Sequence, residues 1–319
     1  MSKALTTPDF STLIKTPSPV VHLDDKVARQ AGVSIYVKRD DLLHPEFGGN
    51  KWRKLKYNLQ ACCQQQASGI LTFGGAYSNH LLATAAAGAA SGIPTIGIVR
   101  GEPASADNPT LRRASALGMQ LQWVDRATYR QRHSATYWQD LRARYGEVYI
   151  VPEGGSNVRA LAGVAELVVE MRAQLPRFDV ICCPVGSGGT LAGIVGALAG
   201  AETAMGISVL RGADYLVREV ERLLGVPDLR GRWQINDTYH CGGYARVTRD
   251  LVRFCDDFAA HHGIPLEPIY SGKMMYGIFD LISRRRWPPE TVLVALHTGG
   301  LQGLAGMENR LNALRAGGE

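Results

Sequence analysis

The chain has 319 residues, of which 45% are hydrophobic and 20% are charged, and its formal net charge at pH 7 is +6. A chain of this length and composition is typical of a globular protein with room for two lobes, each with a core. No apolar segment reaches the length of a membrane span, residues 1–20 contain no apolar signal segment, and Arg284–Arg286 is the only basic triplet. We therefore expect a cytoplasmic protein with no membrane or nucleic-acid partner.

Strand and helix patterns alternate along the chain. Predicted strands cover residues 33–37, 70–73, 95–99, 121–124, 148–151, 179–183 and 291–296. Predicted helices cover residues 51–66, 79–91, 109–117, 127–145, 157–175 and 191–198. This alternation predicts an α/β fold with mostly parallel sheets that helices cover on both faces. We place lobe boundaries near Lys54 and at residues 152–156, where Gly154-Gly155 interrupts the pattern.

The cysteines give no sign of a metal site. Two adjacent pairs occur among the six, at Cys62-Cys63 and Cys182-Cys183, but there is no Cys-x-x-Cys and no His-Glu-x-x-His. A zinc site is therefore not expected. Cys182-Cys183 lies in an apolar strand pattern, which favours small core residues over catalytic thiols.

Ligands of α/β proteins bind at the carboxyl ends of the strands, and three strand ends carry informative loops. Gly74-Gly75 leads to Ser78-Asn79-His80, and His297-Thr298-Gly299-Gly300 ends the last predicted strand. The third loop, residues 184–190, has the form of a phosphate cradle, because glycines let backbone N–H groups converge at the start of a helix. The loop has no Walker lysine, and no Gly-x-Gly-x-x-Gly motif opens a first strand-helix unit. Nucleoside triphosphates and dinucleotides are therefore disfavoured as ligands.

A cluster of lysines opens the first long helix. The chain has only eight lysines, and Lys51, Lys54 and Lys56 follow directly on Gly48-Gly49-Asn50. A buried lysine can lose its proton and attack a carbonyl, which arginine cannot do. Lys54 or Lys56 alone would suit a solvated helix face, whereas Lys51 is a candidate reactive amine. A reactive amine, a phosphate cradle and a hydroxyl at a strand end are together what pyridoxal 5′-phosphate requires.

The sequence also resembles a known family, the fold-type-II pyridoxal-phosphate enzymes, and within them the 1-aminocyclopropane-1-carboxylate deaminases and D-cysteine desulfhydrases. The resemblance covers nearly the whole chain and is carried by four motifs: Gly48–Lys51, Ser78–His80, Glu267–Lys273 and His297–Gly300. It implies two open, mostly parallel sheets, each covered by helices, as in the tryptophan synthase β subunit. It also implies a homodimer whose large cofactor-binding domain comprises residues 1–53 and 156–319 and whose small domain comprises residues 54–155.

The same resemblance implies roles for individual residues. Lys51 would attach the cofactor, Asn79 would bond its 3′-oxygen, and Ser271 or Thr298 would lie at its pyridine nitrogen. The cofactor phosphate would be bound by Lys54 together with Gly186, Ser187, Gly188, Gly189 and Thr190. The substrate would be bound by Tyr77, Ser78, Asn79 and His80, and two tyrosines, Tyr244 and Tyr270, would complete the active site. Each tyrosine could equally be a packed ring with a satisfied hydroxyl.

Two motifs separate the branches of this family. In the deaminases these two motifs look like Tyr-Glu-Gly-Lys and His-Leu-Gly-Gly. This chain has Tyr270-Ser271-Gly272-Lys273 and His297-Thr298-Gly299-Gly300, which are similar to the motifs of the desulfhydrases. A hydroxyl leaves the pyridine nitrogen largely neutral, and this milder electron sink is adequate when a thiolate leaves. We therefore expect β-elimination from a small amino acid, with D-cysteine giving pyruvate, sulfide and ammonia.

Several alternatives stay open at this stage. The α-proton could be removed by Lys51 or by a tyrosine with Ser78. Deamination of 1-aminocyclopropane-1-carboxylate is the main alternative activity, and a non-catalytic protein that binds small anions is a more distant one. Tyr77 replaces the glutamine usual in the family, and residues 241–247 lack its acidic stretch, so the substrate itself is open.

Overall fold

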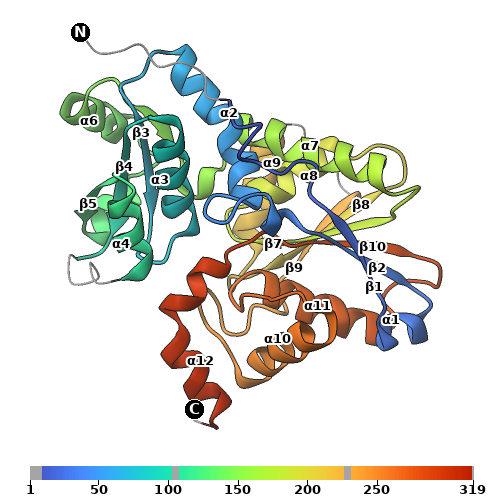
Figure 1. Ribbon diagram of the computed structural model, residues 1–319. Coiled ribbons are helices and arrows are strands. Elements are labelled where there is room, and N and C mark those ends of the chain that lie inside the picture. The colour runs from blue at the N-terminus through green and yellow to red at the C-terminus, as the bar shows by residue number, and fades with distance from the viewer. Residues whose placement is uncertain (1–8, 103–107, 226–230, 318–319) are drawn as a thin grey trace.

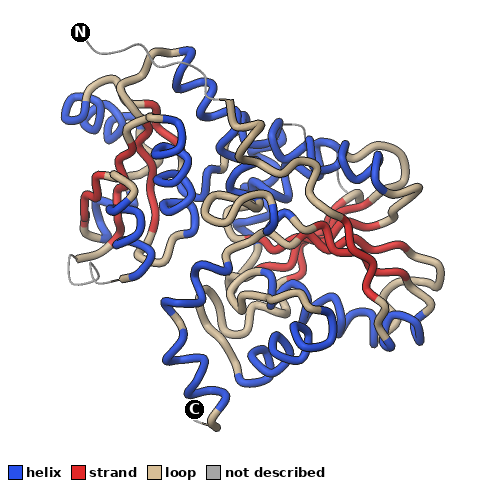
Figure 2. The backbone as a smooth tube through the Cα atoms, in the orientation of Figure 1, coloured by secondary structure: helices blue, strands red, loops and turns tan. Residues whose placement is uncertain are grey.

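The structure is a computed structural model that describes residues 9–102, 108–225 and 231–317. Its strands form two separate sheets (Figures 1 and 2). The larger sheet has the order β1 (Val20–Leu23), β2 (Ser34–Lys38), β10 (Val292–Leu296), β7 (Val180–Val185), β8 (Thr203–Ser208), β9 (Trp233–Asn236). The smaller has the order β5 (Gln120–Val124), β4 (Thr95–Arg100), β3 (Ile70–Gly74), β6 (Tyr149–Val151). The strands pair in parallel except β1 with β2.

Helices cover both faces of the larger sheet (Figure 1). One face packs against α7 (Val158–Gln174), α8 (Gly189–Ala197) and α9 (Asp214–Leu224). The other packs against α1 (Lys26–Ala31), α10 (Arg249–His262), α11 (Ser271–Ser283) and α12 (Glu308–Arg315). None of the helices in the described ranges is both long and apolar enough to cross a bilayer.

The smaller sheet is covered in the same way. One face packs against α5 (Arg126–Arg130) and α6 (Ala135–Tyr145). Apolar residues of α2 (Asn50–Gln64), α3 (Asn79–Ser91) and α4 (Pro109–Ala116) cover the other. Within the described ranges, short 3-10 turns lie in the loops at η1 (Asp40–Leu42), η3 (Glu153–Gly155) and η4 (Leu301–Gly306).

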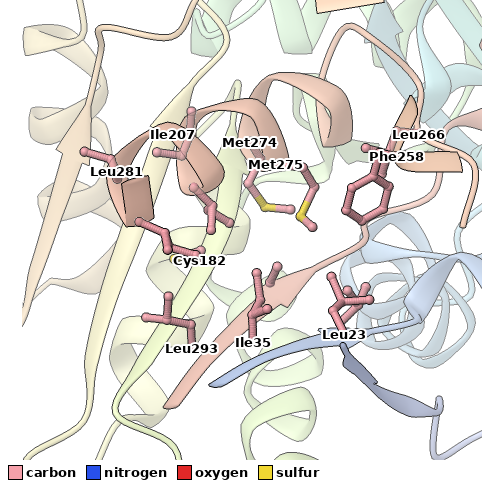
Figure 3. Close-up of a cluster of buried hydrophobic side chains, with 14 of the residues drawn as sticks. Leu23, Ile35, Cys182, Ile207, Phe258, Leu266, Met274, Met275, Leu281 and Leu293 are labelled. Atoms are coloured by element: carbon pink, nitrogen blue, oxygen red, sulfur yellow. The ribbon is translucent and has the colours of Figure 1, made fainter. Parts of the chain in front are cut away.

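Alternation along the central strands divides the apolar residues between two cores. Cys182 points into the core shared with α10 and α11, together with Leu293 and Ile35 (Figure 3). Its neighbour Cys183 points into the opposite core, against α7 and α8. Both cysteines are fully buried, which confirms that they are core residues. Burial raises the pKa of the Cys183 thiol to about 12, so it is unreactive at neutral pH.

The predicted fold class is confirmed, and so are the predicted strands. The predicted continuous helix over residues 127–145 is wrong, because α5 ends at Arg130 and α6 begins at Ala135. The turn between them is fixed by the Trp138 indole, which donates to the Arg132 carbonyl at 2.7 Å. Three strands, β1, β8 and β9, had not been predicted. Helix α2 runs across the proposed domain boundary at residues 53 and 54, so the domain limits stay a prediction.

A buried ionic network fastens the start of α2 to the larger sheet. Arg53, with 2% of its side chain exposed, donates to both carboxylate oxygens of Asp40 at 2.6 and 2.8 Å. It also donates to both oxygens of Glu170 on α7 at 2.9 Å, and Lys38 on β2 donates to the same carboxylate at 2.8 Å. Helices α2 and α7 are in close contact here, since a Cβ on Gly163 would lie 1.9 Å from the Arg53 carbonyl oxygen.

Replacing Arg53 with methionine should lower the free energy of unfolding by about 3–5 kcal/mol, because two carboxylates lose their common partner. Urea unfolding followed by circular dichroism measures the loss. The control is Arg315→Ala, which breaks an ion pair to Asp256 whose two side chains are each 45% exposed and should cost below about 1 kcal/mol. Equal losses in the two variants would show that the network contributes no more than a surface pair.

Candidate active site

Helix α2 begins where two loops of the larger sheet meet. Gly49 precedes it with φ of +67°, a backbone conformation that favours glycine. A Cβ on Gly49 would lie 2.0 Å from the Thr298 carbonyl oxygen, so only glycine allows the loop after β10 to approach this closely. This contact brings Lys51, the second residue of α2 and the predicted reactive amine, to the carboxyl end of the larger sheet.

The amine of Lys51 is suited to act as a nucleophile or a base. The side chain is half-buried and makes no hydrogen bond or ion pair with any residue that the structure describes. Burial lowers its pKa from 10.5 to about 8, although the carboxylate of Glu153 opposes that shift. An amine with this pKa is partly neutral near physiological pH, which is the state that attacks a carbonyl.

The predicted phosphate loop follows β7. Gly188 has φ of +76° and precedes α8, whose first N–H groups have no partner within the helix. A Cβ on Gly189 would lie 2.5 Å from the Ser156 hydroxyl and 3.2 Å from the Lys54 amine. The Asn50 side chain donates to the Thr190 hydroxyl at 2.8 Å, which ties α2 to α8. The structure therefore brings together a glycine-rich loop at a helix N-terminus and Lys54 of α2.

Lys54 gives the clearest indication of what this glycine-rich loop binds. Its buried amine donates to the Gly154 carbonyl and the Ser156 hydroxyl, each at 3.1 Å, and to the Ser187 hydroxyl at 3.4 Å. No carboxylate of the described residues pairs with it. Burial, with the nearby Lys51 charge as a second cause, holds its pKa well below 10.5. An anion bound at the glycine-rich loop would balance the charge of the Lys54 ammonium group, so these residues fit a phosphate group.

Ser156 is a site residue that the sequence analysis missed. Its hydroxyl lies 2.7 Å from that of Ser187, so the turn after β6 contributes to the phosphate loop. The signal that could have found it is its position after Gly154-Gly155, both with positive φ. That turn had been considered only as a lobe boundary.

The residues predicted to contact substrate begin helix α3. The Ser78 hydroxyl caps the helix by accepting from the Leu81 N–H at 3.3 Å. The Asn79 side-chain nitrogen would lie 2.9 Å from a Cβ on Gly300, so the loop after β10 passes directly beside it. Tyr77 is 49% exposed and packs on Gly306. A cavity of about 200 Å³ opens between Tyr77, Asn79 and Tyr270.

His80, also predicted to contact substrate, is buried behind these residues. The Thr72 hydroxyl donates to the Val151 carbonyl at 2.8 Å and so must accept from His80 Nε2, also at 2.8 Å. The proton therefore belongs on Nε2, and Nδ1 is a buried acceptor with no partner in the structure. Burial, then the charges of Lys51 and Lys54, hold its pKa well below 6.5. His80 is thus a neutral residue beneath the lysines.

The two predicted tyrosines lie side by side. The Tyr270 hydroxyl donates to that of Tyr244 at 3.4 Å, and the rings meet edge to face with centroids 6.1 Å apart. Tyr270 also contacts the phosphate loop, since a Cβ on Gly186 would lie 3.1 Å from its ring. Burial raises the pKa of both hydroxyls. They are therefore protonated at neutral pH and can donate a hydrogen bond or a proton.

The two hydroxyls proposed for the pyridine nitrogen have different surroundings. Ser271 is fully buried, and its hydroxyl accepts from the Glu267 N–H at 3.0 Å and donates to the Glu267 carbonyl at 3.2 Å. The Thr298 hydroxyl makes no hydrogen bond within the described residues, although the residue is only 7% exposed. Thr298 is therefore the one with a free hydroxyl, while the assignment itself stays a prediction.

Glu267, to which the sequence analysis gave no role, caps helix α11. Its carboxylate accepts from the backbone N–H groups of Ile269 at 2.8 Å, Tyr270 at 2.7 Å and Ser271 at 2.6 Å. Burial raises its pKa to about 7, while these hydrogen bonds oppose the shift. The carboxylate thereby fixes the backbone of Tyr270 and Ser271 at the edge of the cavity.

Comparison with known proteins agrees with this geometry. Residues 12–299 match the model of the family described as pyridoxal-phosphate dependent enzyme. A putative 1-aminocyclopropane-1-carboxylate deaminase of Thermotoga maritima is 33% identical over 92% of this chain and 97% of that protein. A D-cysteine desulfhydrase of Klebsiella pneumoniae is 29% identical over 92% of this chain and 94% of that protein. A solved structure titled as an ACC deaminase homologue superposes with a TM-score of 0.80 at 29% identity, covering 95% of each chain.

Replacing Lys54 with methionine should weaken binding of pyridoxal 5′-phosphate by roughly ten- to a hundredfold, because a hydrogen bond to a charged group contributes about 1.5–3 kcal/mol. Equilibrium dialysis of the apoprotein gives the dissociation constant. Lys56→Met is the control, since that amine lies on the same helix but pairs with Glu166 at 2.6 Å and is about one-third exposed. Equal affinity in the Lys54 variant and the wild type would contradict the phosphate assignment.

Proposed function

This chain belongs to the pyridoxal-phosphate-dependent enzyme family, and we propose that it catalyses β-elimination from a small amino acid, as a D-cysteine desulfhydrase does. The cofactor, when bound, supplies the electron sink for chemistry at the substrate α-carbon. The observation that carries the choice of reaction is the free Thr298 hydroxyl at the carboxyl end of β10, with Ser271 in place of the glutamate of the deaminases.

In this proposal the protein's own residues bind the cofactor and the substrate. Lys54 and the glycine loop 186–190 bind the phosphate, and Lys51 attaches the cofactor. Ser78 and Asn79, at the start of α3, bind the substrate carboxylate, because the first N–H groups of a helix favour an anion. The cavity beside Tyr77 receives the substrate and is lined mainly by apolar side chains such as Leu304 and Met307.

The protonation states favour Lys51 as the base. Its pKa of about 8 leaves a neutral fraction at physiological pH that can take the α-proton. The raised pKa values of Tyr244 and Tyr270 keep those hydroxyls protonated, which suits donors better than bases. We therefore assign proton removal to Lys51 Nζ and assign proton delivery to the leaving group to the hydroxyl of one of the tyrosines.

Deamination of 1-aminocyclopropane-1-carboxylate is the second candidate. The putative deaminase of Thermotoga maritima is more similar to this chain than the Klebsiella desulfhydrase is. One structural observation also favours it: the Glu267 carboxylate lies 3.3 Å from the Ser271 hydroxyl. With a pKa of about 7, Glu267 is partly ionised at neutral pH. It places a carboxylate beside Ser271, the position at which the deaminases have a glutamate.

The family resemblance further supports a cytoplasmic homodimer with a large domain of residues 1–53 and 156–319 and a small domain of residues 54–155. Sedimentation equilibrium gives the oligomeric state, and a mass near twice 34.6 kDa is expected.

The purified protein should bind pyridoxal 5′-phosphate and show the absorbance band of a lysine-bound cofactor. Addition of D-cysteine should release sulfide and pyruvate, whereas L-cysteine and 1-aminocyclopropane-1-carboxylate should be poorer substrates. Release of 2-oxobutyrate from the cyclopropane in preference to sulfide from D-cysteine would replace the proposed reaction with the second candidate.

Lys51→Ala should abolish the lysine-bound absorbance band and reduce turnover by at least about 10²–10⁴-fold, since both the attachment point and the base are lost. The control is Lys56→Ala, which removes an amine from the same helix and should keep band and turnover. Normal turnover in the Lys51 variant would contradict the assignment of the whole site.

A further inference from the structure

Lys273 is a buried cation that the proposed mechanism does not use. It is 0% exposed on α11, and it makes no ion pair with any carboxylate in the described part of the chain. Its amine donates to the Gly243 carbonyl at 2.8 Å and to the Val209 carbonyl at 3.5 Å. Burying an ammonium group against two neutral carbonyls is unfavourable compared with burying an apolar side chain of the same length. Stability alone therefore does not account for a lysine here.

The loop that Lys273 holds has an unusual backbone. Positive φ values occur at Cys241 (52°), Gly242 (91°), Gly243 (117°) and Ala245 (54°), and two of these residues are not glycine. Non-glycine residues in this region are strained, and such strain persists only where surrounding contacts fix it. The contacts include the amine of Lys273 and the guanidinium of Arg310, which donates to the Ala245 carbonyl at 2.9 Å.

The residue placed by this strained loop is Tyr244. It follows Gly243 directly, is 41% exposed, and reaches the Tyr270 hydroxyl at 3.4 Å. Tyr270 precedes α11 and is fixed through its backbone N–H by Glu267 at 2.7 Å. Glu267, just before α11, thus holds one tyrosine, and Lys273, in the first turn of α11, holds the other.

We propose that Lys273 is a positioning residue that aligns Tyr244 with Tyr270 by holding the Gly243 carbonyl. The inference rests on the proposed function only in giving Tyr244 a role in turnover. It explains the position of a buried lysine at the end of the Tyr270-Ser271-Gly272-Lys273 motif. It also gives Lys273 a role distinct from the cofactor-binding roles proposed for Lys51 and Lys54.

Lys273→Met keeps an unbranched apolar side chain as far as Cε and removes the charged amine, which is the hydrogen-bond donor. The Gly243 carbonyl keeps its second donor, the Arg246 N–H at 3.1 Å, and the Val209 carbonyl loses only a contact of 3.5 Å. We expect a midpoint of thermal unfolding at pH 7 equal to or above that of the wild type, together with kcat/KM lowered roughly 10²-fold. Lower stability with unchanged kcat/KM would overturn the proposal, because that is the signature of a structural role.

A double-mutant cycle tests whether Lys273 acts through Tyr244. Tyr244→Phe should cost about as much kcat/KM as Lys273→Met, and the double variant should lie within about twofold of Tyr244→Phe. Losses that multiply would show that the two residues act independently and would overturn the proposal. Tyr239→Phe is the matched control, since it breaks a 2.6 Å hydrogen bond from the same segment to Asp280 of α11, away from Tyr244. It should show independent losses with Tyr244→Phe.

A second arm needs neither cofactor nor substrate. Hydrogen exchange of residues 242–247 in the apoprotein should be at least about tenfold faster in Lys273→Met than in wild type or Tyr239→Phe. Unchanged exchange would overturn the proposal even if activity fell. If no tested amino acid is turned over by the wild type, the proposed function fails, while this arm still decides whether Lys273 holds the loop.

The pH dependence of stability gives a third readout. Burial lowers the pKa of Lys273 from 10.5 to about 8; Cys241 and Glu267 oppose this shift and Arg310 adds to it. Between these values the unfolded chain binds the proton and the folded chain does not, so the wild type gains stability as pH rises. The stability advantage of Lys273→Met should therefore shrink from pH 8 to 10. A constant difference would contradict a charged Lys273 at neutral pH.

Discussion

Two ammonium groups, those of Lys51 and Lys54, are held at the carboxyl end of the larger sheet without a carboxylate at ion-pair distance among the described residues. In addition to burial, the Lys51 charge lowers the pKa of Lys54, and the charges of both lysines lower the pKa of His80. The site is therefore electrostatically incomplete as a protein structure alone. In the proposed site, a phosphate at the glycine loop 186–190 would supply the missing negative charge, and the same anion would allow Lys54 to stay protonated while Lys51 reacts.

This arrangement depends on the fixed position of α2. Arg53 lies between Lys51 and Lys54 in sequence, yet its guanidinium is neutralised by Asp40 and Glu170. Successive residues of one helix turn thus enter different environments, since each is rotated about 100° from the last. One cation is paired with carboxylates and anchors the helix, and the neighbouring amines are left unpaired for chemistry.

The sequence was sufficient for the features that depend on local pattern. Apolar β-branched runs marked the central strands, and glycines before a helix marked the phosphate loop and the start of α2. The features that it could not give depend on contacts between distant residues. Glu267 was visible only as part of a motif, and its cap on α11 needs the chain to turn back within three residues. The bond from Lys273 to Gly243 joins residues 30 positions apart, and no local pattern encodes it.

The break between α5 and α6 shows a different limit. Residues 127–145 have an acceptable helical pattern, but Asp125 caps a first short helix and Trp138 folds back on the turn that ends it. The competing contact is formed by the indole of Trp138, eight residues beyond the end of α5 at Arg130, and is decided by packing. Likewise β8 includes Gly206, where a Cβ would lie 2.5 Å from Val185, so the interior of the sheet there requires a residue with low strand propensity.

Helix α2 also belongs to both halves of the molecule. Its first turn is fastened to the larger sheet through Arg53, while Leu55, Leu59 and Cys62 pack in the core of the smaller sheet beside Ile70. A ligand that binds at Lys51 and Lys54 stabilises the native state by mass action, and α2 passes that stabilisation to both cores. Without it, either half can open with less effect on the other. Cofactor supply should therefore govern how long the protein survives proteolysis in the cell, independently of whether substrate is present.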